Sequence, residues 1–431
     1  MLTTSHIEEG ILKVGIGKYG SEPIPDELAD FIIRDLENPE IFSIQKGALI
    51  GALFLKGFES EGEKKIQKYL NLYTAEDIIN QFCSFTKENY STIVHLLKKL
   101  LEQKTLTLEE SYQIGKFLFD NNVPENNEFE IGLITTIFRF RYETIEEYLG
   151  LLKSIEERYD KKWTSLPDNL QNKTVIITEP FDGVERSYLV TPLIGKTFIE
   201  NNFIPVYIVS DNPGPKFHYN LKDLAIKLNG TFINSTEEFL ENINKNLEPF
   251  GFFIDIKELN PILLRWIHRR KLLKKRPFLA TLERIYNPLN ASIQVFSAFH
   301  PPYLEKTSEI LQKKNIPVIF GIRRGEEGGL TFSYNKRNES LLSIKQNNNY
   351  IQKKDTYFYA TTYKISYTPN IEDNKKIIEN FSTYKNIYNI ELAIMKELEN
   401  QIQEFQHYIN FQIEKTLEIY TNFISEIKSQ S

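Results

Sequence analysis

The feature that most constrains the fold is a series of short apolar runs in the second half of the chain, separated by segments with helical patterning. The runs are almost continuously apolar, as in strands that are covered on both faces. Helical patterns fill the gaps between them, for example at residues 221–228 and 305–313. We therefore expect a largely parallel sheet with helices on both faces. The predicted strands are Thr174–Thr178, Pro205–Val209, Gly251–Ile254, Ile293–Phe296 and Pro317–Phe320.

The first part of the chain, from about residue 24 to 160, has helical patterning only. Asp26–Glu37 spaces its apolar residues by three and four positions, which predicts a helix that buries the stripe Leu28, Phe31, Ile32 and Leu36. A second helix is predicted to follow, with Ser43 as its N-cap and Gly57 near its end. Gly47 and Gly51 make its surface small, so a neighbouring helix can approach closely.

The same helical design recurs at a spacing of about 82 to 85 residues, which indicates a degenerate duplication. Two amphipathic helical hairpins also resemble each other without a duplication, so the paired positions carry the interpretation. We expect a first helical unit at residues 1–90, a second at 91–163 and an α/β domain with C-terminal helices at 164–431. The paired positions are Ile24–Glu27 with Leu106–Glu109, Gly47 with Gly132, Lys56 with Arg141, and Glu59–Ser60 with Glu143–Thr144.

Composition excludes several classes of protein. A net charge of −6 argues against binding nucleic acid through the overall charge and leaves room only for a local basic patch. The single cysteine, Cys83, excludes an intrachain disulfide and a cysteine-based zinc site, and it fits a reducing compartment. The start of the chain lacks the pattern of a secretory signal, and the longest apolar run is far short of the roughly 20 residues that span a bilayer. We expect a cytoplasmic protein with no membrane partner.

A resemblance to a known family is carried by the segment that follows the first predicted strand. Thr178-Glu179-Pro180-Phe181-Asp182 is followed by Gly183, Arg186 and Thr191-Pro192. Further matching segments are Gly17–Gly20, His268–Pro277, Tyr286–Pro288, Val295–Tyr303 and Gly325–Gly329. These segments resemble the anthranilate phosphoribosyltransferase-like (glycosyl transferase) family, in particular a divergent branch that has DGxxR in place of the glycine run GTGGD and includes nucleic-acid-binding members.

The resemblance implies a helical domain beside an α/β domain, with a cleft between them, as in nucleoside phosphorylases and phosphoribosyltransferases. It also implies displacement of pyrophosphate from phosphoribosyl pyrophosphate with the help of Mg²⁺, but this chain departs from that site. Pro180 removes an amide donor, Phe181 adds bulk, and Glu179 adds negative charge where a phosphate would lie. Leu330-Thr331 stands at the place of the family's acidic pair.

No metal site and no cofactor are therefore expected. Glu326 and Glu327 lie near the place of the missing acidic pair, and they are either replacement ligands or a solvated acidic turn. The expected ligand-binding residues in the cleft are Asp182, Gly183, Arg186, Thr191, Lys216 and Arg276. Arg276 matches the arginine that contacts the anthranilate carboxylate in the family, but Ala280 replaces its companion asparagine. For His300, which precedes Pro301-Pro302, packing at the start of a helix is favoured over a catalytic role.

A basic run is the strongest local signal, with no acidic residue between Arg265 and Arg276. It is either the solvated face of a helix or a patch that contacts phosphates. Its charges do not form one helical stripe, so part of the run is expected to be a loop. The predicted polyanion-binding residues are Arg265, Arg269, Arg270, Lys271, Lys274 and Lys275.

The functional hypothesis is a family member that has lost phosphoribosyl transfer to anthranilate and binds a polyanion, either nucleic acid or a phosphorylated small molecule. The alternatives are an active glycosyl or phosphoribosyl transferase with a rebuilt phosphate site, and a structural interaction protein. Relatives of this fold usually dimerise through the helical domain. Because a second helical unit can replace the partner's, a monomer with an internal repeat is favoured over a homodimer.

Overall fold

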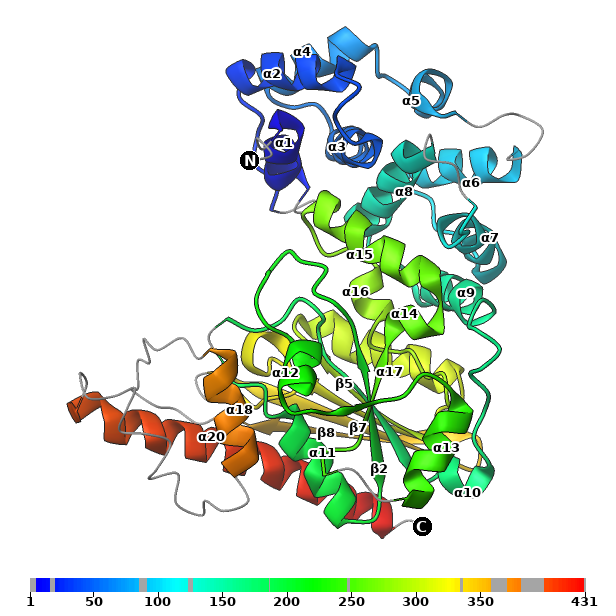
Figure 1. The fold of residues 1–431 in the computed structure, drawn as a ribbon. Helices are drawn as coiled ribbons and strands as arrows, with labels where there is room; N and C mark the ends of the chain where they lie inside the picture. Colours follow the sequence, from blue (N-terminus) through cyan, green and yellow to red (C-terminus); the bar gives the residue numbers. More distant parts are fainter. Residues whose placement is uncertain are drawn as a thin grey trace. The chain divides into compact units, whose positions relative to one another are not determined.

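The computed structural model describes residues 5–15, 20–84, 91–122, 127–185, 187–245, 249–333, 336–357, 370–380 and 399–429. The chain divides into two compact units (Figure 1), which we call the helical unit and the sheet unit. The helical unit comprises residues 1–159, 213–215 and 260–282, and the sheet unit comprises the remainder. Residues 260–282 were predicted to belong to the α/β domain. They belong to the helical unit, because the side chains of their helices pack on it.

The helical unit consists of nine N-terminal helices and two that enter from later in the chain, counted over the residues that the structure describes. Phe31 is 43% exposed, so the stripe predicted for α2 is narrower than expected and consists of Leu28, Ala29 and Ile32. Ser43 is the first helical residue of α3 and not its N-cap, which is Phe42. The helices are α1 (His6–Val14), α2 (Asp26–Glu37), α3 (Ser43–Lys56), α4 (Glu61–Leu70), α5 (Ala75–Phe82), α6 (Ser91–Leu101), α7 (Leu108–Leu118), α8 (Glu128–Arg141), α9 (Ile145–Glu156), α15 (Pro261–Leu273) and α16 (Leu279–Leu282).

Two fully buried glutamates hold equivalent places in the two halves of the helical unit. Glu63 forms a capping box with Ser60, accepts a hydrogen bond from the Ile24 amide at 3.1 Å and pairs with Lys56 at 3.0 Å. Glu147 forms the same capping box with Thr144, accepts from the Leu106 amide at 2.8 Å and pairs with Arg141. Each of these partners is a position that the sequence pattern paired with its counterpart, so the contacts of the two glutamates are equivalent, while the duplication itself stays a prediction.

Helices α3 and α8 cross at their glycines, and the contact is reciprocal. A Cβ atom on Gly47 would lie 1.9 Å from the carbonyl oxygen of Phe129, and one on Gly132 would lie 2.0 Å from that of Ile44. Because 44 and 129, like 47 and 132, are equivalent positions of the repeat, the two halves meet through equivalent surfaces with local twofold character. The small-residue faces thus cover each other within one chain.

The sheet unit contains one eight-stranded sheet in the order β3-β4-β2-β1-β5-β6-β7-β8. The first six strands are parallel, and β7 and β8 form an antiparallel hairpin at one edge. All five predicted runs overlap strands, two of them starting one residue early at Gly251 and Pro317, whereas β3 and the hairpin were not predicted. The strands are β1 (Thr174–Thr178), β2 (Ile204–Val209), β3 (Thr231–Phe232), β4 (Phe252–Asp255), β5 (Ile293–Ala298), β6 (Val318–Arg323), β7 (Asn338–Gln346) and β8 (Asn349–Tyr357).

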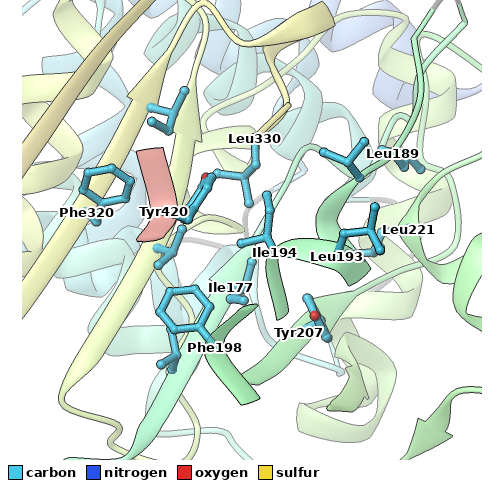
Figure 2. Close-up of a cluster of buried hydrophobic side chains, with 14 of the residues drawn as sticks. Ile177, Leu189, Leu193, Ile194, Phe198, Tyr207, Leu221, Phe320, Leu330 and Tyr420 are labelled. Atoms are coloured by element: carbon cyan, nitrogen blue, oxygen red, sulfur yellow. The ribbon is translucent and has the colours of Figure 1, made fainter. Parts of the chain in front are cut away.

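Helices cover both faces of the sheet. Alternate residues of a strand point to opposite faces, and β1 and β2 are buried along their whole length, so both faces need a cover. On one face, Phe320 of β6 stacks on Phe423 of α20 with ring centroids 4.2 Å apart, and Phe198 of α11 lies edge-on to Tyr420 (Figure 2). On the other face, Phe252 packs edge-on against Phe239 of α13. The helices of this unit are α10 (Asp168–Gln171), α11 (Thr191–Glu200), α12 (Leu221–Lys227), α13 (Thr236–Lys245), α14 (Ile256–Leu259), α17 (Pro301–Lys313), α18 (Ile371–Asn380) and α20 (Glu399–Lys428).

No helix in the described part of the chain combines the length and the apolar character needed to cross a membrane.

Candidate functional site at the carboxyl edge of the sheet

The direction in which the sheet is built reverses at β1, which pairs with β2 on one side and β5 on the other. In open α/β sheets, ligands bind outside the carboxyl ends of the strands at such a switch point. The loop after β1 begins at Glu179, and the loop after β5 consists of Phe299 and His300. His300 is the N-cap residue of α17 and its ring lies edge-on to Phe299, as expected for a residue at the start of a helix.

Glu179 lies in the interior just after β1, and sequence reasoning treated it only as a fixed negative charge. Its side chain accepts hydrogen bonds from the Thr191 hydroxyl and, at 3.4 Å, from the Leu330 amide. Burial raises the pKa of Glu179 to about 7, although these hydrogen bonds and the charge of Arg284 act in the opposite direction. Glu179 is therefore partly protonated near neutral pH, and its charge repels a phosphate less than predicted.

The next residues of the loop are held by burial, by hydrogen bonds to their backbone and by a close backbone contact. Phe181 and Asp182 are buried, and their carbonyl oxygens accept hydrogen bonds from the side chains of Asn220 and Asn212. Gly183 has a positive φ of 77°, and a Cβ atom there would lie 2.4 Å from the carbonyl oxygen of Tyr219. Gly183 is thus required for backbone packing. Arg186 lies outside the described residues, so its role stays a prediction.

The Glu327 carboxylate accepts hydrogen bonds from the next residues of this loop. The Glu185 amide lies 3.0 Å from both of its oxygens, and the Ser187 hydroxyl donates to it at 3.1 Å. Lys216 completes the group, with its ammonium nitrogen 3.1 Å from the carboxylate. Lys216, which was predicted to bind a ligand, therefore faces a carboxylate of the same chain, and its contact with a ligand stays a prediction.

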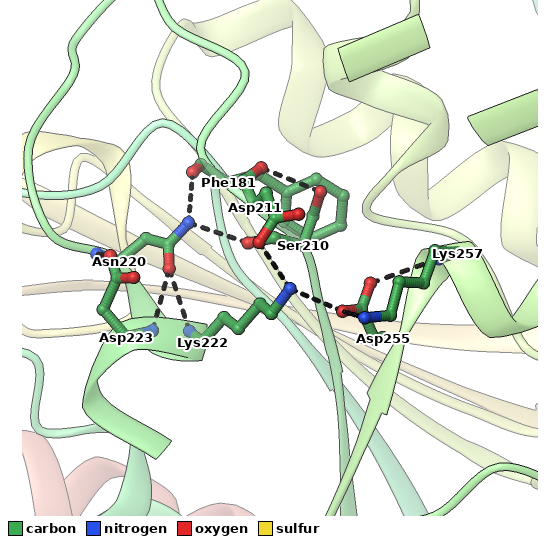
Figure 3. A network of polar contacts seen from close by, with 8 residues as sticks. All are labelled: Phe181, Ser210, Asp211, Asn220, Lys222, Asp223, Asp255 and Lys257. Atoms are coloured by element: carbon green, nitrogen blue, oxygen red, sulfur yellow. Dashed lines mark hydrogen bonds and ion pairs between the residues drawn. The ribbon is translucent and has the colours of Figure 1, made fainter. Parts of the chain in front are cut away.

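A second polar network spans the ends of β2 and β4 (Figure 3). Lys222 at the start of α12 pairs with Asp211 and, at 2.6 Å, with Asp255, which also lies 3.6 Å from Lys257. Burial lowers the pKa of Lys222, but the two carboxylates outweigh it and the pKa lies above its usual value. Sequence reasoning missed this network, although Asp211 and Asp255 each stand at the end of a predicted apolar run.

Glu326 and Glu327 do not form a pair of free carboxylates. Glu326 accepts a hydrogen bond from the Ser333 hydroxyl at 2.9 Å, while Glu327 is held by Lys216 and the β1 loop. Across the described residues, no group of three or more His, Cys, Asp or Glu side chains is arranged to hold a metal ion. The donor set here is cationic and protic, which suits an anion better than Mg²⁺.

The basic run lies in the helical unit and is not one exposed patch. Arg269 and Arg270 are buried, and Arg265 and Arg269 both pair with Glu128 at 2.8 Å. Arg269 also lies over the Trp266 ring, 5.0 Å from its centroid. Glu128, which pairs with Arg265 and Arg269, comes from α8. The sequence of the basic run alone could not predict this partner.

Lys274 and Lys275 also have partners inside the helical unit. Lys274, in a left-handed conformation at the end of α15, pairs with Glu8 at 2.9 Å. Lys275 donates to the carbonyl oxygen of Leu12 at 3.2 Å, and burial lowers its pKa. Lys271 is half-buried. The carbonyl oxygen of Arg276 accepts a hydrogen bond from Arg139, and the predicted contact of its side chain with a ligand stays a prediction.

Comparisons with known proteins give distant sequence relatives. No protein-family model matches the chain. It is 25% identical over 232 residues to an uncharacterised protein of Aquifex aeolicus, covering 52% of this chain and 64% of that protein. It is 26% identical over 220 residues to an anthranilate phosphoribosyltransferase of Bacillus cereus, covering 50% and 60% respectively. The chain thus spans less than two thirds of the length of these curated relatives.

Solved structures agree on the fold. The anthranilate phosphoribosyltransferase of Saccharomyces cerevisiae in complex with PRPP and Mg has a TM-score of 0.53 at 12% identity, covering 79% of this chain and 100% of that one. The enzyme of Thermus thermophilus has a TM-score of 0.50 at 14% identity, covering 77% and 99%. The chain thus has the helical and mostly parallel α/β fold of these anthranilate phosphoribosyltransferases, and it is distantly similar in sequence to members of that family.

Proposed function

We propose that this chain has lost phosphoribosyl transfer to anthranilate and binds a phosphorylated small molecule at the carboxyl edge of the sheet unit. The observation that carries the proposal is the state of the loop after β1. Its amide and hydroxyl donors at Glu185 and Ser187 point at the Glu327 carboxylate. Pro180 has no amide hydrogen, and Phe181 is buried. A loop built in this way offers few free amides to a pyrophosphate.

Magnesium is not part of the proposed function. A Mg²⁺ ion is usually held by one or two carboxylates together with substrate phosphates. Of the two candidate carboxylates, Glu327 is already neutralised by Lys216, and Glu326 is turned to Ser333. The proposed function therefore uses no metal.

The geometry favours a phosphorylated small molecule over nucleic acid as the ligand. Binding of nucleic acid through its backbone requires several solvent-facing cations. In the basic run, Arg265, Arg269 and Lys274 are paired with acids, and Arg270 is buried. A salt-dependent affinity of the purified protein for single-stranded DNA or RNA at low salt, lost on Lys271→Glu, would instead favour the polyanion alternative.

The proposed function is tested by giving the purified protein anthranilate, phosphoribosyl pyrophosphate and Mg²⁺. We expect no Mg²⁺-dependent consumption of anthranilate, followed by its fluorescence. Calorimetric titration with phosphoribosyl pyrophosphate and with ribose 5-phosphate, both without metal, is expected to show saturable binding. Turnover of anthranilate would overturn the loss of activity, and an absence of binding to either compound would overturn the ligand class.

A second candidate, a transferase with a rebuilt site, is favoured by one observation. Glu179 has a pKa of about 7 and lies at the switch point, where a buried acid is suited to proton transfer. If an acceptor is found by screening, Glu179→Gln separates the two candidates. An active transferase loses most of its rate in this variant, whereas a binding protein keeps its affinity within about threefold, which corresponds to less than 1 kcal/mol.

A further inference from the structure

We infer that Glu327 is a built-in competitor for an oxyanion site formed by the Glu185 amide, the Ser187 hydroxyl and the Lys216 ammonium group. This inference rests on the proposed function, because it names the donors that a phosphoryl group would use. The three donors come from two separate loops and converge on one carboxylate at 3.0 to 3.1 Å. A charged donor and two neutral ones around an anion form a strong and specific set of hydrogen bonds.

The arrangement of the three donors suits any anion, whether it is Glu327 or a ligand. Ser187 is 5% exposed, so its hydroxyl is fixed inside the loop. The Lys216 side chain is about one-third exposed, so this donor borders the solvent. A phosphoryl group has the same charge preference as a carboxylate and carries more acceptor oxygens. It can therefore replace the carboxylate without a change in the protein's donors.

The competing carboxylate is placed so that it can leave. Its side chain is 14% exposed, in contrast to Glu179, which is enclosed. Glu327 has a positive φ of 50°, which is uncommon for a residue with a side chain and costs energy. Gly325, Gly328 and Gly329 surround it in the sequence, and glycines give the short segment other backbone conformations to adopt. An incoming phosphoryl group would release Glu327 to water and relieve this strained backbone.

An intramolecular carboxylate competes at an effective concentration on the order of millimolar or above. This competition lowers the affinity of the site for every anion. Only a ligand that makes contacts beyond its anionic group overcomes the competition. A phosphate ester bound also through its organic part fits this requirement, whereas free phosphate does not. Glu327 thereby competes with simple anions for the three donors and prevents them from binding.

The test is calorimetric titration with inorganic pyrophosphate, without metal and at constant ionic strength. The wild-type protein is compared with Glu327→Ala and Glu327→Gln, and with Glu326→Ala as a matched control that removes the neighbouring carboxylate. We expect the Glu327 variants to bind pyrophosphate at least about tenfold more tightly than wild type, and the control to bind as wild type does. Glu327→Gln keeps the side-chain volume, so it serves as the test if the alanine variant does not fold.

The gain must depend on the donors. Adding Lys216→Ala to Glu327→Ala is expected to remove the gain, whereas adding Lys257→Ala, which removes a cation of the Asp255 network, is expected to leave it. If neither Glu327 variant gains affinity, or if the gain survives the loss of Lys216, the inference is wrong. The proposed function fails separately, when wild type binds no phosphorylated ligand, because that result does not depend on what the variants do with pyrophosphate.

Discussion

At the scale of single residues, side chains and donors of the loop after β1 are buried or hydrogen-bonded within the protein. Glu179 is enclosed, Phe181 is buried, and the donors at Glu185 and Ser187 serve Glu327. In the family this loop is implied to be open and rich in glycine. Here the carbonyl oxygens of Phe181 and Asp182 and the donors at Glu185 and Ser187 are all hydrogen-bonded to side chains of the same protein.

Glu179 should make the stability of the protein depend on pH. Its pKa rises from an ordinary 4.5 to about 7 on folding, so the folded protein binds more protons than the unfolded chain between these values. Its contribution is fully present below pH 4.5 and is lost as the pH rises through 7, by up to about 3 kcal/mol in the free energy of unfolding. Urea denaturation at pH 5 and pH 8 should show this loss, and Glu179→Gln should show it less. An equal pH dependence in both proteins contradicts the prediction.

At the scale of elements, the helical unit is built from two copies of one design. In each copy a buried glutamate connects the start of one helix, the end of a second and the capping box of a third. Each copy leaves its small-residue face open, and the crossing of α3 with α8 covers both faces. The repeat is thus stabilised by the contact between its halves.

Loss of either buried glutamate should be strongly destabilising. Glu63→Ala leaves Lys56 without its buried partner and the Ile24 amide without an acceptor, and Glu147→Ala does the same to Arg141 and the Leu106 amide. Each variant should lose about 3 to 5 kcal/mol in the free energy of unfolding. Glu61→Ala, which removes an exposed pair with Lys64, should lose less than about 1 kcal/mol. Chemical denaturation measures all three, and equal losses would contradict this account.

The glycine crossing should tolerate no side chain. Gly47→Ala and Gly132→Ala each place a methyl group against a backbone carbonyl of the facing helix. We expect each to lower the free energy of unfolding by about 1 to 3 kcal/mol, although alanine favours the helix. Gly51→Ala is the control, because its nearest atom, at 2.9 Å, is the end of the Leu133 side chain, which can move. Thermal unfolding should therefore place Gly51→Ala nearest to wild type.

At the scale of the whole molecule, the internal repeat bears on assembly. The faces that carry Gly47 and Gly132 are covered by each other within one chain, so neither is free to join a second copy. We predict a monomer in dilute solution, because the two halves are covalently linked and meet at high effective concentration. Analytical ultracentrifugation at micromolar concentration should give the mass of one chain. A stable dimer joined through residues 44–57 of both chains would contradict the prediction.

The sequence by itself determined the strands that are covered on both faces and the positions of the repeat. Strands β1, β2, β4, β5 and β6 were visible because continuous apolar runs bounded by helical patterns have few other structures available. Gly47 with Gly132 and Lys56 with Arg141 were visible because both copies keep the residues that their contacts require. The edge hairpin of β7 and β8 was missed because neither strand is a continuous apolar run: β7 mixes Leu341, Leu342 and Ile344 with polar residues, and β8 is mostly polar and exposed. The two-residue turn at Asn347-Asn348 was a further local signal.

Only the tertiary structure decided which charges are satisfied and by what. Arg269 pairs with Glu128 across 141 positions, and the Glu185 amide meets Glu327 across 142. No pattern within one segment contains such contacts, since they exist only once the helices have packed and the sheet has brought its loops together. The basic run was therefore predicted to be a surface, whereas Arg265, Arg269 and Lys274 form ion pairs inside the helical unit and Arg270 is buried. For the same reason Glu327, predicted as a metal ligand or a solvated turn, is the anion that fills the β1 loop.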